Sequence, residues 1–570
     1  MNNKLFNIEN IVEALKANNI KKIVISPGGT NIPLIKQLQG DSFFTCYSVV
    51  DERSAMYFAI GLYLKTGEVI ATSCTSAQAT RNYIPGLTEA YYKNVPILAI
   101  TMSKHPKFTY QGYMQGPDQT SLPKDCVKKS YSLPFIADDY DKLHSMRAIN
   151  EAMLEVTTGV PGPVQLNVPW LDFPIKYEIN TFKPISFIEK TQIDFSSLKN
   201  RKVLLVIGES RPFDKDTTEL INVFSNSTNC VVYTNHLSNF HGENVVCGNL
   251  LLTCISDIYF EKELMPDILI TIGGQTGDYP LYRKLSAINY KSFEHWHVSK
   301  DLRVKDTYDH LTLHIHSSIY DFFKSYDCSI NEESHDYLKA WRDFEKEINR
   351  QVTLPFSNAS CARKMAGKIP PSSIVNFAIL NSLRVWSWFN IHPSIECYST
   401  VSAFGIDGGT SMLIGESIES NQLCFLFTGD LAFYYDINAL GIRHIKNNVR
   451  IMIVNNSGGV EFKYKSNSNA MPIIDKYIAA AGHYKNAKGW AEDCGFIYMS
   501  AKTENEFDDA IDTFVSVSDK PIVLEVFVLD QDEAAAYKKI LNSNLIIEKS
   551  EIIKKKFNGF LTKTKKIING

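Results

Sequence analysis

Two short polar signals in this chain could together hold a metal ion and a phosphate. Gly429-Asp430 and Asn455-Asn456-Ser457-Gly458-Gly459 each follow an apolar run typical of a buried strand, Leu423–Phe427 and Val449–Val454. The carboxyl ends of neighbouring parallel strands meet at the sheet edge where ligands bind, so a carboxylate, an amide oxygen and a glycine-loop carbonyl can converge there. Such oxygen ligands suit Mg²⁺, and glycines let a backbone approach a diphosphate closely.

Each signal alone is also typical of an ordinary strand end or turn. The combination favours the metal site, because Asp430 and Asn456 lie 26 positions apart with a helix-like segment between them. The apolar residues of that segment, Ile437, Leu440, Ile442 and Ile445, have helical spacing. The stretch therefore predicts a strand, a helix and a second strand.

This pairing resembles the cofactor-binding motif of thiamine diphosphate (ThDP) enzymes, in which Gly-Asp is followed by Asn-Asn. The resemblance implies that Asp430, Asn456 and the Gly458 carbonyl hold Mg²⁺ against the diphosphate. Leu431 stands where many members have a second glycine, a variant associated with the menaquinone-pathway branch. Ile406 would be the apolar wedge beneath the cofactor, or otherwise one more core isoleucine. The remaining implied cofactor contacts are Thr75, Gly405, Asp407, Gly429, Leu431 and Gly459.

The N-terminal part alternates strand and helix patterns strictly, from Ile23–Ile25 to the helix expected at Ala77–Tyr92, and so predicts a parallel α/β domain. Within it, Asp51-Glu52-Arg53 lies where a strand becomes a helix. Acidic residues there ordinarily just complement the helix dipole. However, ISPGGTNIPL, VVDERSAMYFAIGLYLKTG, CTSAQATRNYIPGLTEAYYKNVPILAIT and GYMQGPDQT resemble the pyrimidine-binding domain of the SEPHCHC synthase branch, in order, over residues 20–125.

The resemblance implies that Glu52 bonds to N1′ of the cofactor's aminopyrimidine, which lets the cofactor remove its own thiazolium C2 proton. A carboxyl group shielded from water has a raised pKa, so it can share a proton near neutral pH. The cofactor then supplies the electron sink, and the protein supplies the carboxyl group and a dry site.

The substrate pocket departs from that branch. Its enzymes hold the carboxylates of 2-oxoglutarate and isochorismate with arginines, because guanidinium groups bind carboxylates in bidentate fashion. At what look like matching positions this chain has Thr30, Trp386 and Val401, and Asp278-Tyr279 replaces a basic pair. A dicarboxylate would be poorly neutralised in such a pocket. The expected substrate residues are Gly29, Thr30, Asn31, Lys104, Gln115, Ser382, Arg384, Glu461 and Phe462, with Lys104 and Arg384 as the remaining anion contacts.

The chain of 570 residues, 44% of them apolar, is long enough for several cores. We expect three parallel-sheet α/β domains of the ThDP decarboxylase/carboligase type: a pyrimidine-binding domain (1–185), a central domain (200–340) and a diphosphate-binding domain (360–535). A basic extension (536–570) follows, with seven lysines and one glutamate from Lys549 onward. It is a solvated helix, an oligomer contact or a surface for an anionic partner.

The composition limits which partners and which cellular compartment we expect for this protein. A net charge of −3 gives no reason to expect nucleic acid as a partner. The eleven cysteines form no Cys-x-x-Cys pair and the start has no signal-peptide pattern, which predicts a cytoplasmic protein. No apolar run reaches the ~18 residues of a transmembrane segment.

These expectations combine into one hypothesis: a ThDP- and Mg²⁺-dependent transferase or lyase that decarboxylates a small 2-oxo acid, such as pyruvate, and joins the acyl carbon to an electrophilic acceptor. Two alternatives stay open. One is a divergent SEPHCHC synthase using 2-oxoglutarate and isochorismate, and the other is a non-catalytic regulatory or assembly subunit of the same fold. The resemblance also implies a homodimer or homotetramer with active sites between subunits.

Overall fold

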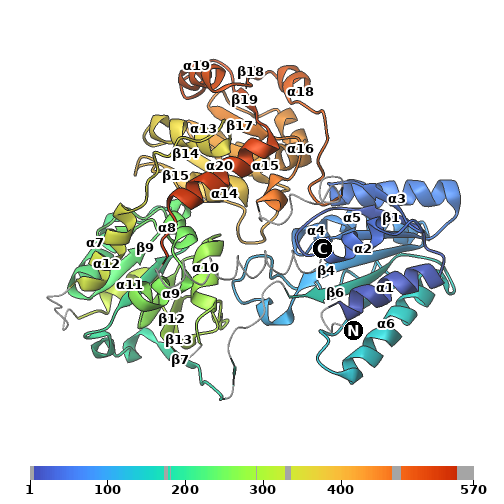
Figure 1. Cartoon of the computed structure of the whole chain (residues 1–570), viewed down its shortest axis with the longest axis horizontal. Helices are drawn as coiled ribbons and strands as arrows, with labels where there is room; N and C mark the ends of the chain where they lie inside the picture. The colour runs from blue at the N-terminus through green and yellow to red at the C-terminus, as the bar shows by residue number, and fades with distance from the viewer. Residues whose placement is uncertain are drawn as a thin grey trace, which may run out of the picture. The chain divides into compact units, whose positions relative to one another are not determined.

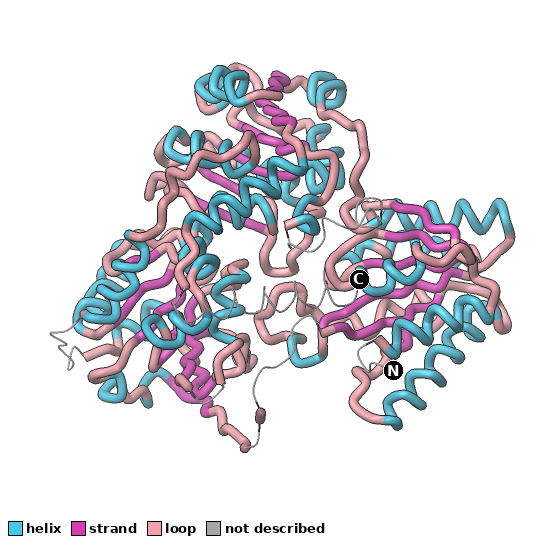
Figure 2. The backbone as a smooth tube through the Cα atoms, in the orientation of Figure 1, coloured by secondary structure: helices cyan, strands magenta, loops and turns pink. Residues whose placement is uncertain are grey.

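The computed structural model describes residues 5–171, 178–179, 181–289, 292–327, 335–464 and 477–547. They contain three sheets whose paired strands are all parallel, of six, seven and six strands, each flanked by helices (Figures 1 and 2). This confirms the predicted fold class. Two compact units result: Met1–Pro174, Phe356–Leu383 and Tyr398–Ala534 form the first, and Ile175–Pro355, Arg384–Cys397 and Ala535–Gly570 the second.

The N-terminal sheet has the strand order β2-β1-β3-β4-β6-β5. Its strands are β1 (Lys22–Ile25), β2 (Thr45–Ser48), β3 (Ile70–Cys74), β4 (Ile97–Lys104), β5 (Ser130–Ser132) and β6 (Val164–Trp170). Helices cover both faces, so the inner strands are buried apolar runs. One core packs α1 (Phe6–Ala17), α2 (Ile32–Gln39) and α6 (Asp139–Thr157) on the sheet, and the other packs α3 (Glu52–Thr66) and α5 (Ile84–Tyr92).

The helix expected at Ala77–Tyr92 is two helices, α4 (Gln78–Asn82) and α5. Tyr83 separates them, and Pro85 lies in the first turn of α5. Proline is favoured in that turn because its missing N–H needs no partner there, whereas inside a continuous helix it would remove a hydrogen bond. The break lets α4 approach the strand ends where the candidate site forms.

The second unit contains the central sheet, with the order β10-β9-β8-β11-β12-β13-β7. Its strands are β7 (Ser186–Glu189), β8 (Val203–Ile207), β9 (Cys230–Tyr233), β10 (Val245–Val246), β11 (Ile268–Ile272), β12 (Glu294–Ser299) and β13 (Leu311–His316). The accompanying helices are α7 (Lys215–Ser227), α8 (Asn249–Cys254), α9 (Asp257–Tyr259), α10 (Tyr279–Ser286), α11 (Ile319–Lys324) and α12 (Asp336–Lys346).

The C-terminal sheet has the order β15-β14-β16-β17-β19-β18. Its strands are β14 (Ile374–Phe377), β15 (Glu396–Ser399), β16 (Cys424–Gly429), β17 (Val449–Asn455), β18 (Ile497–Ala501) and β19 (Ile522–Phe527). The helices around it are α13 (Asn358–Met365), α14 (Asn381–Trp386), α15 (Gly409–Ile418), α16 (Asp430–Tyr435), α18 (Lys488–Asp493), α19 (Glu504–Phe514) and α20 (Asp530–Ser543).

The segment between β16 and β17 differs from the expectation of one helix centred on Ile437–Ile445. Strand β16 runs two residues beyond Phe427 to Gly429, so α16 begins at once with Asp430 and ends at Tyr435. A short 3₁₀ helix, Ile437–Gly441, follows. The expected apolar residue Ile442 is 38% exposed, because it lies beyond that turn. Among the described residues, no helix is long and apolar enough to cross a bilayer.

Candidate active site

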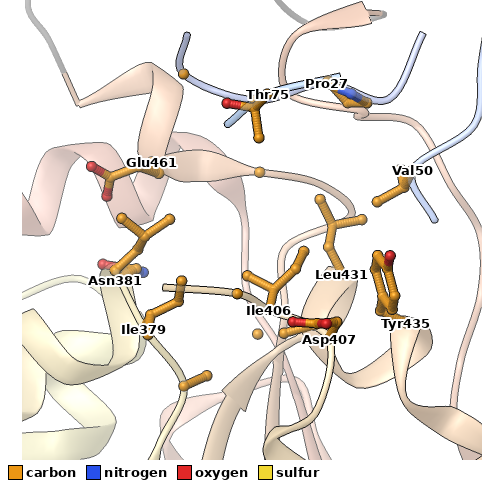
Figure 3. Close-up of a pocket in the computed structure, with 18 of the residues that line it drawn as sticks. Pro27, Val50, Thr75, Ile379, Asn381, Ile406, Asp407, Leu431, Tyr435 and Glu461 are labelled. Atoms are coloured by element: carbon orange, nitrogen blue, oxygen red, sulfur yellow. The ribbon is translucent and has the colours of Figure 1, made fainter. Parts of the chain in front are cut away.

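A cavity of about 200 Å³ lies in the first unit, at the carboxyl ends of strands from both of its sheets (Figure 3). The segments after β1, β2 and β3 form one wall, and those after β14, β15, β16 and β17 form the other. In both sheets the strand order reverses there, between β1 and β3 and between β14 and β16, and open α/β sheets bind ligands at such switch points.

The structure brings every residue expected to bind the cofactor or metal to this cavity. They are Thr75, Gly405, Ile406, Asp407, Gly429, Asp430, Leu431, Asn456, Gly458 and Gly459. Glu52 lines it as well. Of the expected substrate residues, it includes Gly29, Gln115, Ser382, Glu461 and Phe462.

Four expected substrate residues do not line the cavity, and two of them instead hold its loops. Thr30 is 1% exposed; its hydroxyl lies 2.7 Å from the Thr75 hydroxyl and accepts a hydrogen bond from the Ser76 N–H. Asn31 is fully buried, where it accepts from the Gly28 N–H. Both residues therefore position neighbours that reach the cavity.

The two expected anion contacts, Lys104 and Arg384, are also absent from the lining. The Lys104 ammonium at the end of β4 lies 5.9 Å from the centre of the Tyr113 ring. Arg384 belongs to the second unit, where its charge favours the ionised form of Asp278. Asp278 caps α10 and accepts from the Tyr233 hydroxyl at 2.6 Å, so it is structural.

Trp386 and Val401, found where the resemblance suggested arginines, are fully buried. Among the described lining residues, the charged side chains are all acidic: Glu52, Asp407, Asp430 and Glu461. This part of the cavity therefore presents polar and apolar groups without a lysine or arginine.

Glu52 is the first residue of α3 and is 7% exposed. The preceding Asp51 caps that helix by accepting from the Ser54 N–H, which fixes where α3 begins. The Tyr435 hydroxyl donates to Glu52 Oε2 at 2.5 Å. Burial raises the pKa of Glu52 to about 7, although the hydrogen bond from Tyr435 opposes this shift. A carboxyl group with such a pKa can hold and release a proton at neutral pH.

The loop before α15 carries Gly405, Ile406 and Asp407 into the cavity. Asn82 of α4 donates to Asp407 Oδ2 at 3.1 Å, which ties this loop to the opposite wall. A Cβ on Gly405 would lie 2.0 Å from Asp407 Oδ1 and 3.0 Å from Gln78, so a larger residue there would displace the Asp407 carboxylate. Figure 3 shows Ile406 among the lining residues, next to Asp407 and on the side toward Ile379.

The candidate metal ligands meet at the start of α16. Asp430 is 2% exposed, and its Oδ2 accepts from the Gly458 N–H at 3.0 Å and lies 3.0 Å from His483 Nε2. Asn456 Oδ1 is buried and has no hydrogen-bond partner in the described part of the chain. Because such an oxygen is costly to leave unpaired, it fits a cation ligand. The carboxylate, amide and backbone oxygens here suit Mg²⁺ and a diphosphate.

Three features of the site are not predicted by the sequence: the backbone conformation of three lining residues, a buried glutamate and a histidine. Gln115, Leu380 and Phe404 line the cavity with positive φ angles of 63°, 67° and 62°, a strained conformation that concentrates at functional sites. Buried Glu533 supports the wall by accepting from the Asn358 N–H at 2.5 Å. His483 contacts the metal-ligand candidate. Gln115 belongs to the family-like segment GYMQGPDQT and is one of the expected substrate residues, but the other four residues belong to no recognisable motif.

Comparisons with known proteins agree with this geometry. Residues 8–122 match the family model described as "Thiamine pyrophosphate enzyme, N-terminal TPP binding domain". Curated relatives are named 2-succinyl-5-enolpyruvyl-6-hydroxy-3-cyclohexene-1-carboxylate synthase, abbreviated SEPHCHC synthase. The one from Bacteroides fragilis is 31% identical over 93% of this chain and 98% of its own length. Those from Phocaeicola vulgatus and Flavobacterium psychrophilum are 32% and 29% identical over 91% of this chain and 95% of theirs.

Proposed function

Because this chain belongs to the ThDP-dependent enzymes, in the SEPHCHC synthase branch, we propose that it binds ThDP and Mg²⁺ in this cavity and forms a carbon–carbon bond after decarboxylating a 2-oxo acid. The observation that carries the proposal is the convergence of Glu52, Asp430 and Asn456 on one cavity. ThDP, when bound, supplies the electron sink that turns the acyl carbon of the donor into a nucleophile.

Each residue then has a defined task. Asp430, Asn456 and the Gly458 carbonyl would hold the metal and the diphosphate, and Ile406 would support the two rings. Glu52 would exchange a proton with the pyrimidine nitrogen, for which its raised pKa is suited. The apolar lining around these groups excludes water, which strengthens their electrostatic effects. Thr75, Gln115 and the strained loop residues shape the remaining space for substrate.

For the substrates, the acidic lining favours a donor with a single carboxylate, such as pyruvate, and an acceptor without carboxylates. The two expected anion contacts, Lys104 and Arg384, are missing from the described lining, and this observation carries the choice. A dicarboxylate donor would require further protein groups to neutralise its second carboxylate.

The second candidate is SEPHCHC synthase activity with 2-oxoglutarate and isochorismate. The names of the curated relatives support it more directly than they support a pyruvate-dependent enzyme. It requires that basic groups outside the described lining reach the substrates. A non-catalytic role is less favoured, because the catalytic glutamate and both side-chain ligands are present.

A donor screen tests these proposals. Purified protein with ThDP and Mg²⁺ is given pyruvate, 2-oxoglutarate or other 2-oxo acids, with and without aldehydes or isochorismate, and CO₂ release and products are measured. We expect turnover with a monocarboxylate donor. Turnover with 2-oxoglutarate and isochorismate alone would instead establish the second candidate. If cofactor binds but no donor is consumed, the catalytic proposal is wrong.

We also propose a homodimer. The family resemblance implies active sites shared between subunits, whereas both walls of the cavity described here come from one chain. Mixing inactive Glu52→Gln and Asp430→Ala variants under conditions of subunit exchange distinguishes the two arrangements. Shared sites predict recovery of about one quarter of the native activity, since random pairing restores one site in each mixed dimer. No recovery would place the whole site within one chain.

A further inference from the structure

Helix α16 connects the two ends of the active site. Its first residue, Asp430, is the candidate metal ligand, and its last, Tyr435, donates a hydrogen bond to Glu52. With a rise of 1.5 Å per residue, these two residues are about 7.5 Å apart along the helix axis. The helix therefore sets the position of the Glu52 contact relative to the metal end of the cavity. Figure 3 shows Tyr435 and Leu431 of this helix at the cavity, beside Asp407 and Val50.

In the contact between Tyr435 and Glu52, the tyrosine hydroxyl is always the hydrogen-bond donor. Burial and the neighbouring Glu52 carboxylate raise the pKa of Tyr435 far above its usual range, so its hydroxyl stays protonated and acts as a donor. A donor on a carboxylate oxygen favours the ionised form. The hydrogen bond from Tyr435, followed by one from the Glu52 backbone, thus opposes the effect of burial on the pKa of Glu52.

The other titratable groups facing Glu52 do not perform this task. Asp51 and Asp407 are like charges that favour the protonated form of Glu52. The Cys74 thiol and the Tyr83 hydroxyl are fully buried, and burial raises the pKa of each, so both stay neutral. Within the described part of the chain, the side-chain donor to Glu52 is Tyr435, whose hydroxyl lies 2.5 Å from Oε2.

We propose that Tyr435 is a positioning residue, whose hydroxyl holds Glu52 Oε2 and leaves Oε1 to meet the pyrimidine nitrogen of the cofactor. Glu52 gives up and regains one proton in each cycle, and Tyr435 keeps its own. Without the hydroxyl, Glu52 would bind its proton more tightly and release it less readily. The inference rests on the role proposed for Glu52.

The test begins with cofactor-free, full-length protein. Infrared difference spectra recorded across pH follow the C=O stretch of a protonated carboxyl group, and the band missing from Glu52→Gln belongs to Glu52. In Tyr435→Phe we expect the midpoint of this band to rise by about one pH unit or more, as for loss of a hydrogen bond to a charged group. A purely structural tyrosine would change the melting temperature and leave this midpoint unchanged.

Tyr434→Phe is the matched control. Tyr434 is the preceding residue of α16, but its hydroxyl donates to Glu525 at 3.1 Å. Tyr434→Phe should therefore leave the midpoint of the Glu52 infrared titration unchanged. An unchanged midpoint in Tyr435→Phe, or the same shift in both variants, would overturn the inference.

The loaded enzyme gives a second readout. With a donor identified by the screen, Tyr435→Phe should lower kcat about tenfold and change the KM for donor little, because the hydroxyl acts on proton exchange rather than on substrate. The infrared titration needs neither cofactor nor donor. Failure of every donor would therefore count against the proposed function, and an unmoved midpoint against the role of Tyr435.

Discussion

Because Glu52 is buried, its ionisation makes the free energy of unfolding depend on pH. Burial raises the pKa of Glu52 in the folded protein to about 7, from an ordinary value of 4.5. The folded protein therefore binds this proton more tightly than the unfolded chain does. The contribution of Glu52 to stability increases as the pH falls from about 7 towards 4.5, and at higher pH the buried charge destabilises the fold. The burial that lets Glu52 exchange a proton near neutral pH therefore also lowers the free energy of unfolding when Glu52 is ionised.

This predicts a trade-off in Glu52→Gln. Turnover should fall by at least about 100-fold, as for loss of an acid–base group, while ThDP binding measured by calorimetry stays largely intact. The melting temperature should rise at pH 8, where the native carboxylate is charged, and change little at pH 5. Equal activity in the variant would contradict the role of Glu52, and a lower melting temperature at pH 8 would contradict the electrostatic account.

Neighbouring asparagines should respond differently to substitution. Asn456 Oδ1 has no partner in the described structure, so Asn456→Ala should weaken Mg²⁺ binding by about 10- to 100-fold, as for loss of groups that tune a metal site, with little change in melting temperature. Asn455 is 2% exposed and donates to Glu525 at 2.7 Å. Asn455→Ala should mainly lower the melting temperature. Titration of Mg²⁺ with ThDP present separates the two effects, and similar metal affinity in Asn456→Ala would contradict the assignment.

At the scale of elements, the backbone of the loop between β1 and α2 packs closely against the end of β3, and this packing shapes the site. A Cβ on Gly28 would lie 2.3 Å from the Thr75 Cβ, whereas a Cβ on the adjacent Gly29 would meet nothing within 4 Å. The loop therefore packs directly on the end of β3 through Gly28. Thr30 and Asn31 complete this packing by hydrogen bonds rather than by contacts with a ligand.

Gly28→Ala and Gly29→Ala form a matched pair. Gly28→Ala should destabilise the protein by about 1–3 kcal/mol, as overpacking does, and weaken ThDP binding because Thr75 lines the cavity. Gly29→Ala should change the free energy of unfolding by less than about 0.5 kcal/mol. Denaturant unfolding and calorimetry provide the measurements. Equal effects of the two substitutions would contradict the packing argument.

At the scale of the whole molecule, the second unit concentrates buried histidines in its sheet. His295 and His297 of β12 both contact the Thr271 hydroxyl, at 2.8 and 3.0 Å, and the His310 ring stacks on Phe293. Burial lowers the pKa of His297 from 6.5 to about 4 and also lowers the pKa of His295 well below 6.5. These side chains are therefore neutral in the folded protein at neutral pH.

Acid should weaken this unit first. Because the unfolded chain binds protons on these histidines below about pH 6.5 and the folded unit does not, stability is retained above 6.5 and lost as the pH falls towards 4. Asp278 and Asp306, whose pKa burial raises, act in the opposite direction, and their contribution is complete only below 3.8. Hydrogen exchange at pH 7.5 and 5.0 should show loss of protection in β11–β13. Equal protection at both values would contradict this account.

The sequence by itself determined the parallel α/β architecture and the cofactor motifs. Apolar runs and their spacing specify buried strands, Asp430 and Asn456 come directly after two of them, and the family resemblance of its surrounding segment identifies Glu52. These are local signals, so they can be read without knowing which elements meet.

Only the tertiary structure decided which side chains face the cavity. Thr30 and Asn31 turn inward, Arg384 belongs to the other unit, and Tyr435 reaches Glu52 across 383 positions of sequence. Strand order and loop conformation determine such contacts, including positive φ at Gln115, and neither follows from residue spacing.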